Sequence, residues 1–164
     1  MEILIALDLY DDIFSDFDIR GFNERTISRD FLDEMSLRMS RMPAKDKLRV
    51  VFVLPREQRV EHDEVVIVNR IKRFFSYRHT RYRQKDKKVK WRSILFFAIG
   101  LALLAAANFV HHLIPSIFND FLLIPSWFFV WSGLEQFLGS RDKLKKKKHY
   151  YEVLSNARYE FRDK

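Results

Sequence analysis

The sequence predicts an α+β cytoplasmic head with the element order β-α-β-α, joined to a two-helix transmembrane hairpin and a C-terminal basic amphipathic helix. The 164 residues carry 30 Lys and Arg against 22 Asp and Glu, yet residues 93–140 contain no Lys or Arg at all. Two long apolar stretches fall inside this range. In the residues that precede this range, apolar side chains recur at the spacings of strands and helices. We expect a head at 1–69, a basic juxtamembrane helix at 70–92, spans at 93–114 and 120–139 separated by a short loop at 115–119, and a basic helix at 140–164.

The head begins with a strand and a capped helix. Residues 1–10 alternate between apolar and other side chains with a period of two, which predicts a strand. Ser28 is a suitable N-cap for a helix. The helix then carries an apolar stripe that we interpret as core, and Pro43 ends it; the stripe comprises Phe31, Met35, Met39 and Met42.

A second strand and a long helix complete the head. Residues 48–54, LRVVFVL, predict a buried strand that ends at Pro55. Between Glu61 and Gly100 there is no Gly or Pro, and apolar residues recur at helical spacing, so one helix can run from the head into the membrane. The β-branched run Val65–Val68 leaves a third strand open as an alternative. Because two strands do not form a stable sheet, we expect the missing strands to come from a second copy or a partner.

Both apolar stretches are long enough to be considered as membrane spans. Residues 93–114 cover about 33 Å as a helix, which exceeds a hydrocarbon core of about 30 Å. The second stretch, 120–139, contains Pro125 and Gly133, so we expect a kink near Pro125 and leave a re-entrant loop open. A buried soluble helix is the other interpretation of each stretch.

The charges that flank the stretches predict the orientation. Residues 70–92 hold 11 Lys and Arg with one acid, and residues 141–164 hold nine with four acids, whereas the connection at 115–119 has none. The positive-inside rule therefore places both chain ends in the cytoplasm, as in a multi-pass integral membrane protein. The N-terminus lacks the pattern of a cleaved signal peptide, so the first span is expected to be its own insertion signal.

The tail at 140–164 also lacks Gly and Pro, and an apolar stripe predicts a helix; the stripe comprises Leu144, Tyr151, Leu154, Ala157 and Phe161. This helix is expected to emerge beside residues 75–92. Two basic segments side by side repel each other, and anionic lipids relieve that repulsion. The candidate headgroup contacts are Lys87, Lys88, Lys90, Arg92, Lys145, Lys146, Lys147 and Lys148.

Several functional classes are excluded or weakly indicated. The chain has no cysteine, which excludes disulfides, thiolate metal sites and a thiol nucleophile. No phosphate loop, Rossmann fingerprint, HExxH motif or nucleophile elbow is present. The absence of Lys and Arg from residues 93–140 argues against nucleic acid as a partner, and we expect no cofactor and no catalytic residue.

An acidic run at the end of the first strand is a weak candidate metal site; it comprises Asp8, Asp11, Asp12, Asp16 and Asp18. Carboxylates at a strand end can hold Mg²⁺, but no glycine-rich loop follows them. The interleaved aromatics Phe14 and Phe17 favour a surface loop that these side chains pin to the head.

Four polar residues in or beside the spans are further candidates. Glu135 and Asn108 lie within the apolar stretches, near opposite ends, so we expect no direct pairing between them. Adjacent His111 and His112 point about 100° apart on a helix, which disfavours joint metal ligation.

The best functional expectation is a membrane-anchored interaction or assembly module, whose head pairs with itself or with a soluble partner. A subunit of an oligomeric channel, lined by Glu135, Ser132 and Asn108, is the alternative. A membrane-bound Mg²⁺-dependent phosphate enzyme is the weaker alternative.

Overall fold

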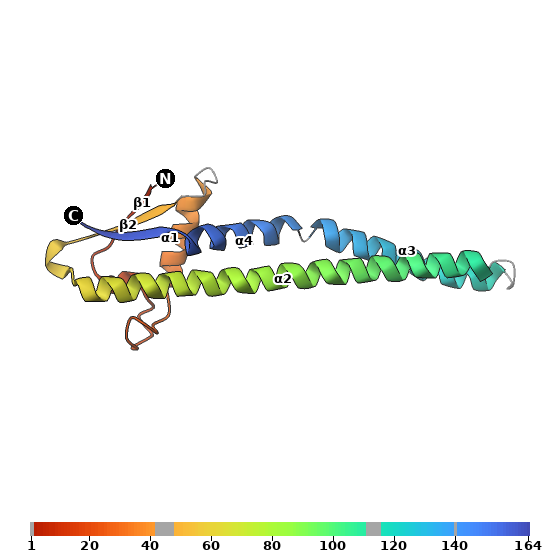
Figure 1. The fold of residues 1–164 in the computed structure, drawn as a ribbon, viewed down its shortest axis with the longest axis horizontal. Helices are drawn as coiled ribbons and strands as arrows, with labels where there is room; N and C mark the ends of the chain where they lie inside the picture. Colours follow the sequence, from red (N-terminus) through yellow and green to blue (C-terminus); the bar gives the residue numbers. More distant parts are fainter. Residues whose placement is uncertain (1, 42–47, 111–115, 140) are drawn as a thin grey trace. The chain divides into compact units, whose positions relative to one another are not determined.

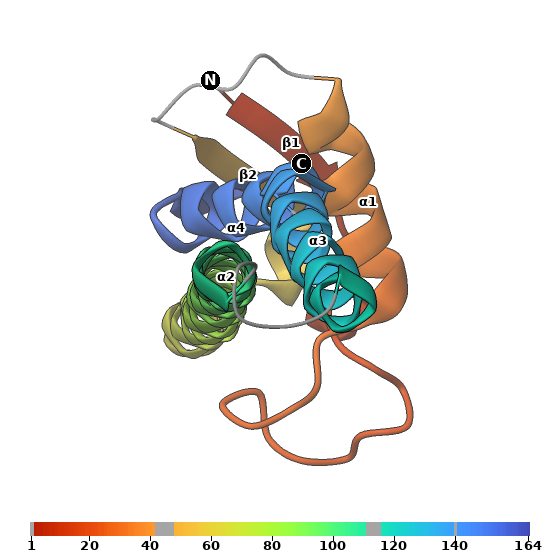
Figure 2. The ribbon, with the colours of Figure 1, turned by 90° about the vertical axis from the view of Figure 1, so that its right-hand side faces the viewer.

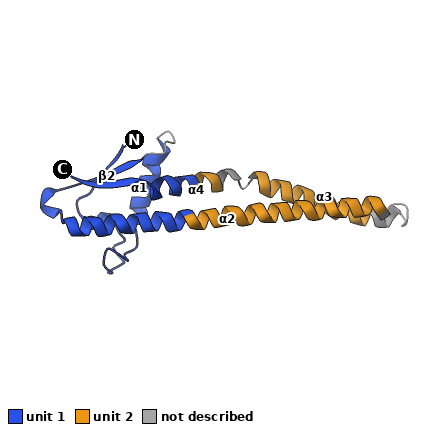
Figure 3. Cartoon of the chain, in the orientation of Figure 1, with its two compact units in different colours: residues 1–79, 149–164 blue, residues 80–148 orange. Residues whose placement is uncertain are grey.

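A computed structural model describes residues 2–41, 48–110, 116–139 and 141–164, and it divides the chain into two compact units (Figure 3). We call residues 1–79 and 149–164 the head unit, and residues 80–148 the hairpin unit. The elements in chain order are β1 (Glu2–Ala6), the 3₁₀ turn η1 (Tyr10–Ile13), α1 (Arg29–Ser40), β2 (Arg49–Leu54), the 3₁₀ turn η2 (Arg56–Gln58), α2 (Glu61–Val110), α3 (Ser116–Gly139), α4 (Arg141–Ser155) and β3 (Arg158–Asp163) (Figure 1).

The head unit is built on a three-stranded, all-parallel sheet with the order β1-β2-β3. The expected strand at 1–10 is present but ends at Ala6, and the expected strand at 48–54 is β2. Parallel crossovers within one sheet follow a right-handed rule, and for the order β1-β2-β3 that rule favours connecting helices on one face of the sheet.

The third strand corrects two expectations. The helix predicted over 140–164 ends at Ser155, and residues 158–163 pair with β2 in parallel, with Tyr159 opposite Val50. The chain itself therefore supplies a strand that we expected from a second copy or a partner. The physical reason is burial: strand pairing places the Tyr159 ring, 6% exposed, over Phe52, with which it stacks at 6.2 Å.

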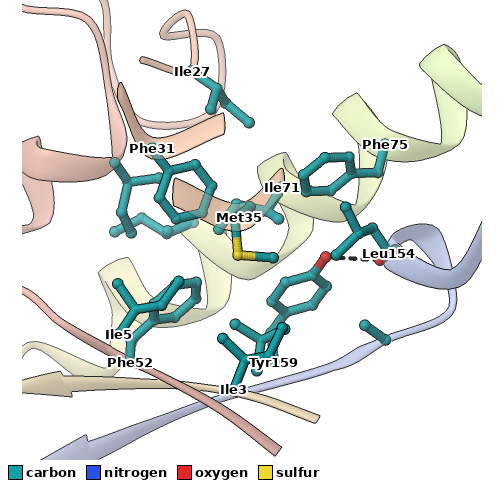
Figure 4. Close-up of a cluster of buried hydrophobic side chains, with 14 of the residues drawn as sticks. Ile3, Ile5, Ile27, Phe31, Met35, Phe52, Ile71, Phe75, Leu154 and Tyr159 are labelled. Atoms are coloured by element: carbon teal, nitrogen blue, oxygen red, sulfur yellow. Dashed lines mark hydrogen bonds between the residues drawn. The ribbon is translucent and has the colours of Figure 1, made fainter. Parts of the chain in front are cut away.

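The core lies between one face of the sheet and the helices. Inward-facing residues of all three strands meet residues of α1, α2 and α4 (Figure 4), and those labelled there are Ile3, Ile5, Ile27, Phe31, Met35, Phe52, Ile71, Phe75, Leu154 and Tyr159. The Ser28 cap is confirmed, because its hydroxyl accepts the Phe31 amide at 3.1 Å. Of the predicted stripe, Phe31 and Met35 are buried and Met39 packs against the core, whereas Met42 and Pro43 lie outside the described residues.

The long helix is confirmed, and Val65–Val68 belong to it rather than to a third strand. Its first turns are tied to both ends of the head: Arg59 pairs with Glu64 at 2.7 Å and also with Asp163 of β3. The Tyr10 hydroxyl accepts the Val60 amide at 2.9 Å and donates to Glu64 at 3.2 Å. These contacts join η1, α2 and β3, so the head unit contains residues from both sides of the hairpin.

The hairpin unit contains two helices that are long and apolar enough to cross a membrane, by length and composition. Only 17% of the most apolar window of α2 and 11% of that of α3 is buried, unlike the core helices of a soluble protein. The described part of the loop expected at 115–119 is helical, because α3 begins at Ser116 and continues through Pro125.

Candidate functional site: an exposed loop and a tight helical seam

A loop between η1 and α1 projects from the head unit (Figure 2). We call residues 15–26 the Asp18 loop. Its two ends are held together by an antiparallel bridge between Phe14 and Ile27 and by a hydrogen bond from the Ser15 amide to the Thr26 carbonyl at 2.8 Å. The chain therefore leaves the head and returns to it at one place.

Asp18 organises the interior of this loop. Its carboxylate accepts hydrogen bonds from the Arg20 guanidinium at 2.7 and 2.9 Å, and from the Thr26 amide and hydroxyl at 2.8 and 2.7 Å. The Arg20 guanidinium and the two Thr26 groups hold the pKa of Asp18 far below its usual range. One charged side chain thus crosslinks three positions of the loop.

The base of the loop is fixed to the head. The Phe22 ring stacks on the buried Phe14 ring at 5.4 Å. From α2, Arg70 donates to the Arg25 carbonyl at 2.9 Å and to the Glu24 carbonyl at 3.3 Å. Burial, followed by the neighbouring Arg73, lowers the pKa of Arg70. The loop is therefore an ordered projection, held by side chains from several directions.

The tip of the loop presents two apolar side chains to solvent. Phe17 and Ile19 are each 99% exposed and lie on either side of Asp18. Large apolar side chains without any cover cost hydration free energy, and ordered apolar groups at a surface are typical of interaction sites. The sequence-based interpretation was right for Phe14, which is buried, and wrong for Phe17, which points away from the head.

The other residues of the acidic run serve the local structure. Asp12 accepts the amides of Asp8 and Leu9 at 2.8 and 3.1 Å, which caps η1. Asp11 pairs with Arg25, and the exposed Asp16 belongs to the Asp18 loop. Among the described residues, no group of three or more His, Asp or Glu side chains is placed to hold a metal ion.

The hairpin unit contains a seam of small residues that the sequence-based analysis missed. A Cβ atom on Gly100 would lie 2.8 Å from the Val130 backbone nitrogen, and one on Gly133 would lie 2.9 Å from the Phe97 backbone nitrogen. Such close approach of two helices requires small side chains. Small residues recur at every seventh position along this seam, and all of them are buried: Ser93, Gly100 and Ala107 on α2, and Ser126 and Gly133 on α3. This spacing is readable in the sequence.

The contacts of the seam also show where Glu135 and Asn108 lie along the length of the two helices. Because Gly133 lies against Ser93 and Phe97, and the helices are antiparallel, Glu135 lies level with about Ser93, beside the basic flank. Asn108 lies 15 residues further along α2, about 22 Å away. Both side chains are exposed, and they do not meet. His111 and His112 lie outside the described residues.

The basic candidates lie on both arms of the hairpin unit. Lys87, Lys88 and Arg92 are exposed, and Lys90 pairs with the largely buried Asp86 at 2.8 Å. On α4, Lys145–Lys147 are exposed and Lys148 is half-buried. The structure thus leaves most of these cations open to solvent or to lipid headgroups.

Comparisons with family models, with curated proteins and with solved structures found no match to this chain. The functional argument therefore depends on the residues themselves.

Proposed function

We propose that this chain is a membrane-anchored interaction module, in which the hairpin unit spans the bilayer and the Asp18 loop of the head unit binds a protein partner. The observation that carries the proposal is the exposure of Phe17 and Ile19 on a loop that hydrogen bonds hold in one conformation. A pre-ordered loop loses little conformational entropy when it binds.

The anchor is supported by composition and by topology. The apolar stretches of α2 and α3 are flanked by basic residues and separated by a segment without any, which favours a cytoplasmic location for both flanks. The head unit contains residues 1–79 together with residues 149–164, and β2 pairs with β3. A hairpin that crosses a membrane twice returns the chain to the same side, as this pairing requires.

The chemistry of the tip indicates the kind of partner. Phe17 and Ile19 suit an apolar cavity, and buried aromatic anchors carry much of the binding free energy at protein interfaces. The acidic Asp16 beside Phe17 disfavours an anionic lipid surface. We therefore propose a protein cavity, and the mechanism is recruitment: the loop captures the partner while the hairpin confines it to the bilayer.

The test uses a photo-crosslinking amino acid at position 17 of the full chain in native membranes. We expect a protein adduct at position 17 that is absent when the same amino acid replaces Tyr77, which is 63% exposed on α2. Ile19→Ser should weaken capture at position 17 by about thirtyfold, which corresponds to the loss of one interface anchor worth about 2 kcal/mol.

A matched pair of loop variants tests the role of rigidity. Asp18→Ala removes the hydrogen bonds to Arg20 and Thr26 and should weaken capture although both apolar side chains remain. Asp16→Ala, two residues away at an exposed position, should leave it unchanged. Equal adducts at positions 17 and 77, or adducts with lipid alone, would contradict the proposal.

The other two functions remain weaker alternatives. A channel requires conductance that changes on Glu135→Gln, and an enzyme requires turnover that is lost when Asp8 and Asp12 become Asn. In the part of the chain that the structure describes, Glu135 lies level with the basic flank and Asp12 caps a turn, so neither residue favours these functions over recruitment.

A further inference from the structure

The hairpin unit contains an apolar groove beside the seam between α2 and α3. Its volume is about 250 Å³, and its lining is almost entirely apolar: Ser93, Ile94 and Phe97 from α2, and Gly133, Leu134 and Phe137 from α3. The absence of a side chain at Gly133 brings the two helices close together and leaves this hollow along their junction. The groove begins where the basic flank of α2 ends.

A groove at this level cannot stay empty in a bilayer. Atoms that line a void lose dispersion contacts, so the surrounding medium fills it. Within a span, that medium consists of acyl chains, which are as apolar as a leucine side chain. A helix with its side chains is about 10–12 Å across, so a helix of a second copy places only single side chains in such a groove. An acyl chain therefore fits the groove better than a helix of a second copy.

The end of the groove carries positive charge on the same face of α2. Lys87, Lys90, Ile94, Phe97 and Leu101 follow one another at spacings of three or four residues, so they lie along one side of the helix. Ser93 and Phe137 line both the groove and a small adjoining notch, which Lys90 also lines. The Lys90 ammonium has three N–H donors, and its ion pair with the Asp86 carboxylate uses one of them. The exposed Lys87 lies one turn further from the spans.

We propose that this groove binds one acyl chain of an anionic phospholipid, whose headgroup phosphate contacts Lys87 and Lys90. The inference rests on the membrane insertion in the proposed function, and it adds a specific ligand site to it. The acyl chain fills the apolar hollow, and the two lysines select for negative charge at the level where a headgroup lies.

The experiment uses the full chain reconstituted in phosphatidylcholine vesicles that contain phosphatidylglycerol with a photoactivatable acyl chain. We expect the adducts to concentrate on peptides 93–97 and 133–137. Ile94→Trp should fill the groove and reduce labelling of 133–137 to the level of other lipid-facing segments. Leu95→Trp is the matched control, because Leu95 is similarly exposed, at 47% against 54%, and lies about 100° around the helix.

A second pair of variants tests the headgroup. Lys87→Gln should reduce the labelling ratio of photoactivatable phosphatidylglycerol to phosphatidylcholine by about fivefold, the effect of one basic residue near an anionic headgroup. Lys88→Gln, at a position that is also exposed but on another face of α2, should leave the ratio near its original value. Far-ultraviolet circular dichroism of each variant shows whether it has folded.

Uniform labelling of all lipid-facing peptides, or equal effects of the two lysine variants, would overturn the site. If the chain is released from vesicles by alkaline carbonate, the anchor itself fails and the site with it. Uniform labelling of a carbonate-resistant chain would overturn the groove alone and leave the proposed function intact.

Discussion

Tyr159 shows how one residue links the last strand to the rest of the head. Its ring is buried, and its hydroxyl donates to the Leu154 carbonyl at 2.7 Å. Burial raises the pKa of Tyr159, and burial also raises the pKa of Tyr150 on α4. The pKa of each phenol is thus higher in the folded chain than in the unfolded chain. Below about pH 10 both states are protonated and the stabilisation is fully present. Above that pH the unfolded chain ionises first, so the free energy of unfolding falls.

We therefore predict that the free energy of unfolding of the head falls steeply above about pH 10. Tyr159→Phe should cost about 1 kcal/mol near neutral pH, through loss of one hydrogen bond. The Leu154 carbonyl keeps its second donor, the Ala157 amide at 3.3 Å, which limits the cost. The variant should also show a shallower alkaline loss. Pulse proteolysis in urea at about pH 8 and about pH 10.5 measures both effects.

The exposed Tyr77 supplies the control, since Tyr77→Phe should change neither value. An unchanged alkaline loss in Tyr159→Phe would show that other groups cause it.

At the scale of elements, the seam between α2 and α3 depends on residues that have almost no side chain. The seven-residue spacing keeps Ser93, Gly100 and Ala107 on one side of α2, and a heptad period is the geometry of helices that coil around each other. The Gly100 backbone contacts the α3 backbone near Ser126 and Val130. Any added carbon there must displace backbone atoms.

We predict that Gly100→Val destabilises the hairpin by about 1–3 kcal/mol, because the new side chain overpacks the seam. Ala102→Val, at an exposed position two residues away, should have little effect. Resistance of the reconstituted chain to unfolding by dodecyl sulfate measures the difference. Equal resistance of the two variants would mean that the helices do not pack through this face.

At the scale of the whole molecule, the head unit is closed by a strand that the chain reaches only after the hairpin. β3 pairs with β2 along six residues, and α4 contributes Val153 and Leu154 to the core. Without this segment the sheet has two strands, which is too few for a stable sheet in water. The head therefore depends on residues from both flanks of the hairpin.

We predict that deletion of residues 157–164 unfolds the head and leaves the hairpin inserted. Residues 48–79 should become sensitive to trypsin, whereas carbonate resistance should persist. Deletion of Lys164 alone is the control, because it leaves all of β3 in place and removes only one backbone hydrogen bond, from the Lys164 amide to the Leu54 carbonyl at 3.1 Å. Continued protection of residues 48–79 in the longer deletion would show that the first two strands are stable without β3.

Local patterns predicted much of the fold. The Ser28 cap, the strand over 48–54 and the uninterrupted helix from residue 61 depend on neighbours within a few positions, and each is present. The third strand was missed because the tail satisfies two periods: Leu154 and Ala157 suit a helix, whereas Tyr159 and Phe161 alternate as in a strand. Pairing with β2, more than 100 residues earlier in the chain, selects the strand.

For the candidate site, too, the sequence predicted one part and missed another. The Asp18 loop was expected as a surface loop, but the run Phe14, Phe17 and Ile19 contains no signal for which side chains point inward. Stacking on Phe22 and the closure of the loop by Thr26 bury Phe14 and leave the other two exposed.

The sequence by itself determined the segregation of charge, the two apolar stretches and the local elements, because these follow from composition and short-range periodicity. Tertiary structure decided which strand completes the sheet, which apolar side chains stay outside and which small residues let two helices touch. These outcomes depend on contacts between residues far apart in the chain, and such contacts select among local conformations that are close in free energy.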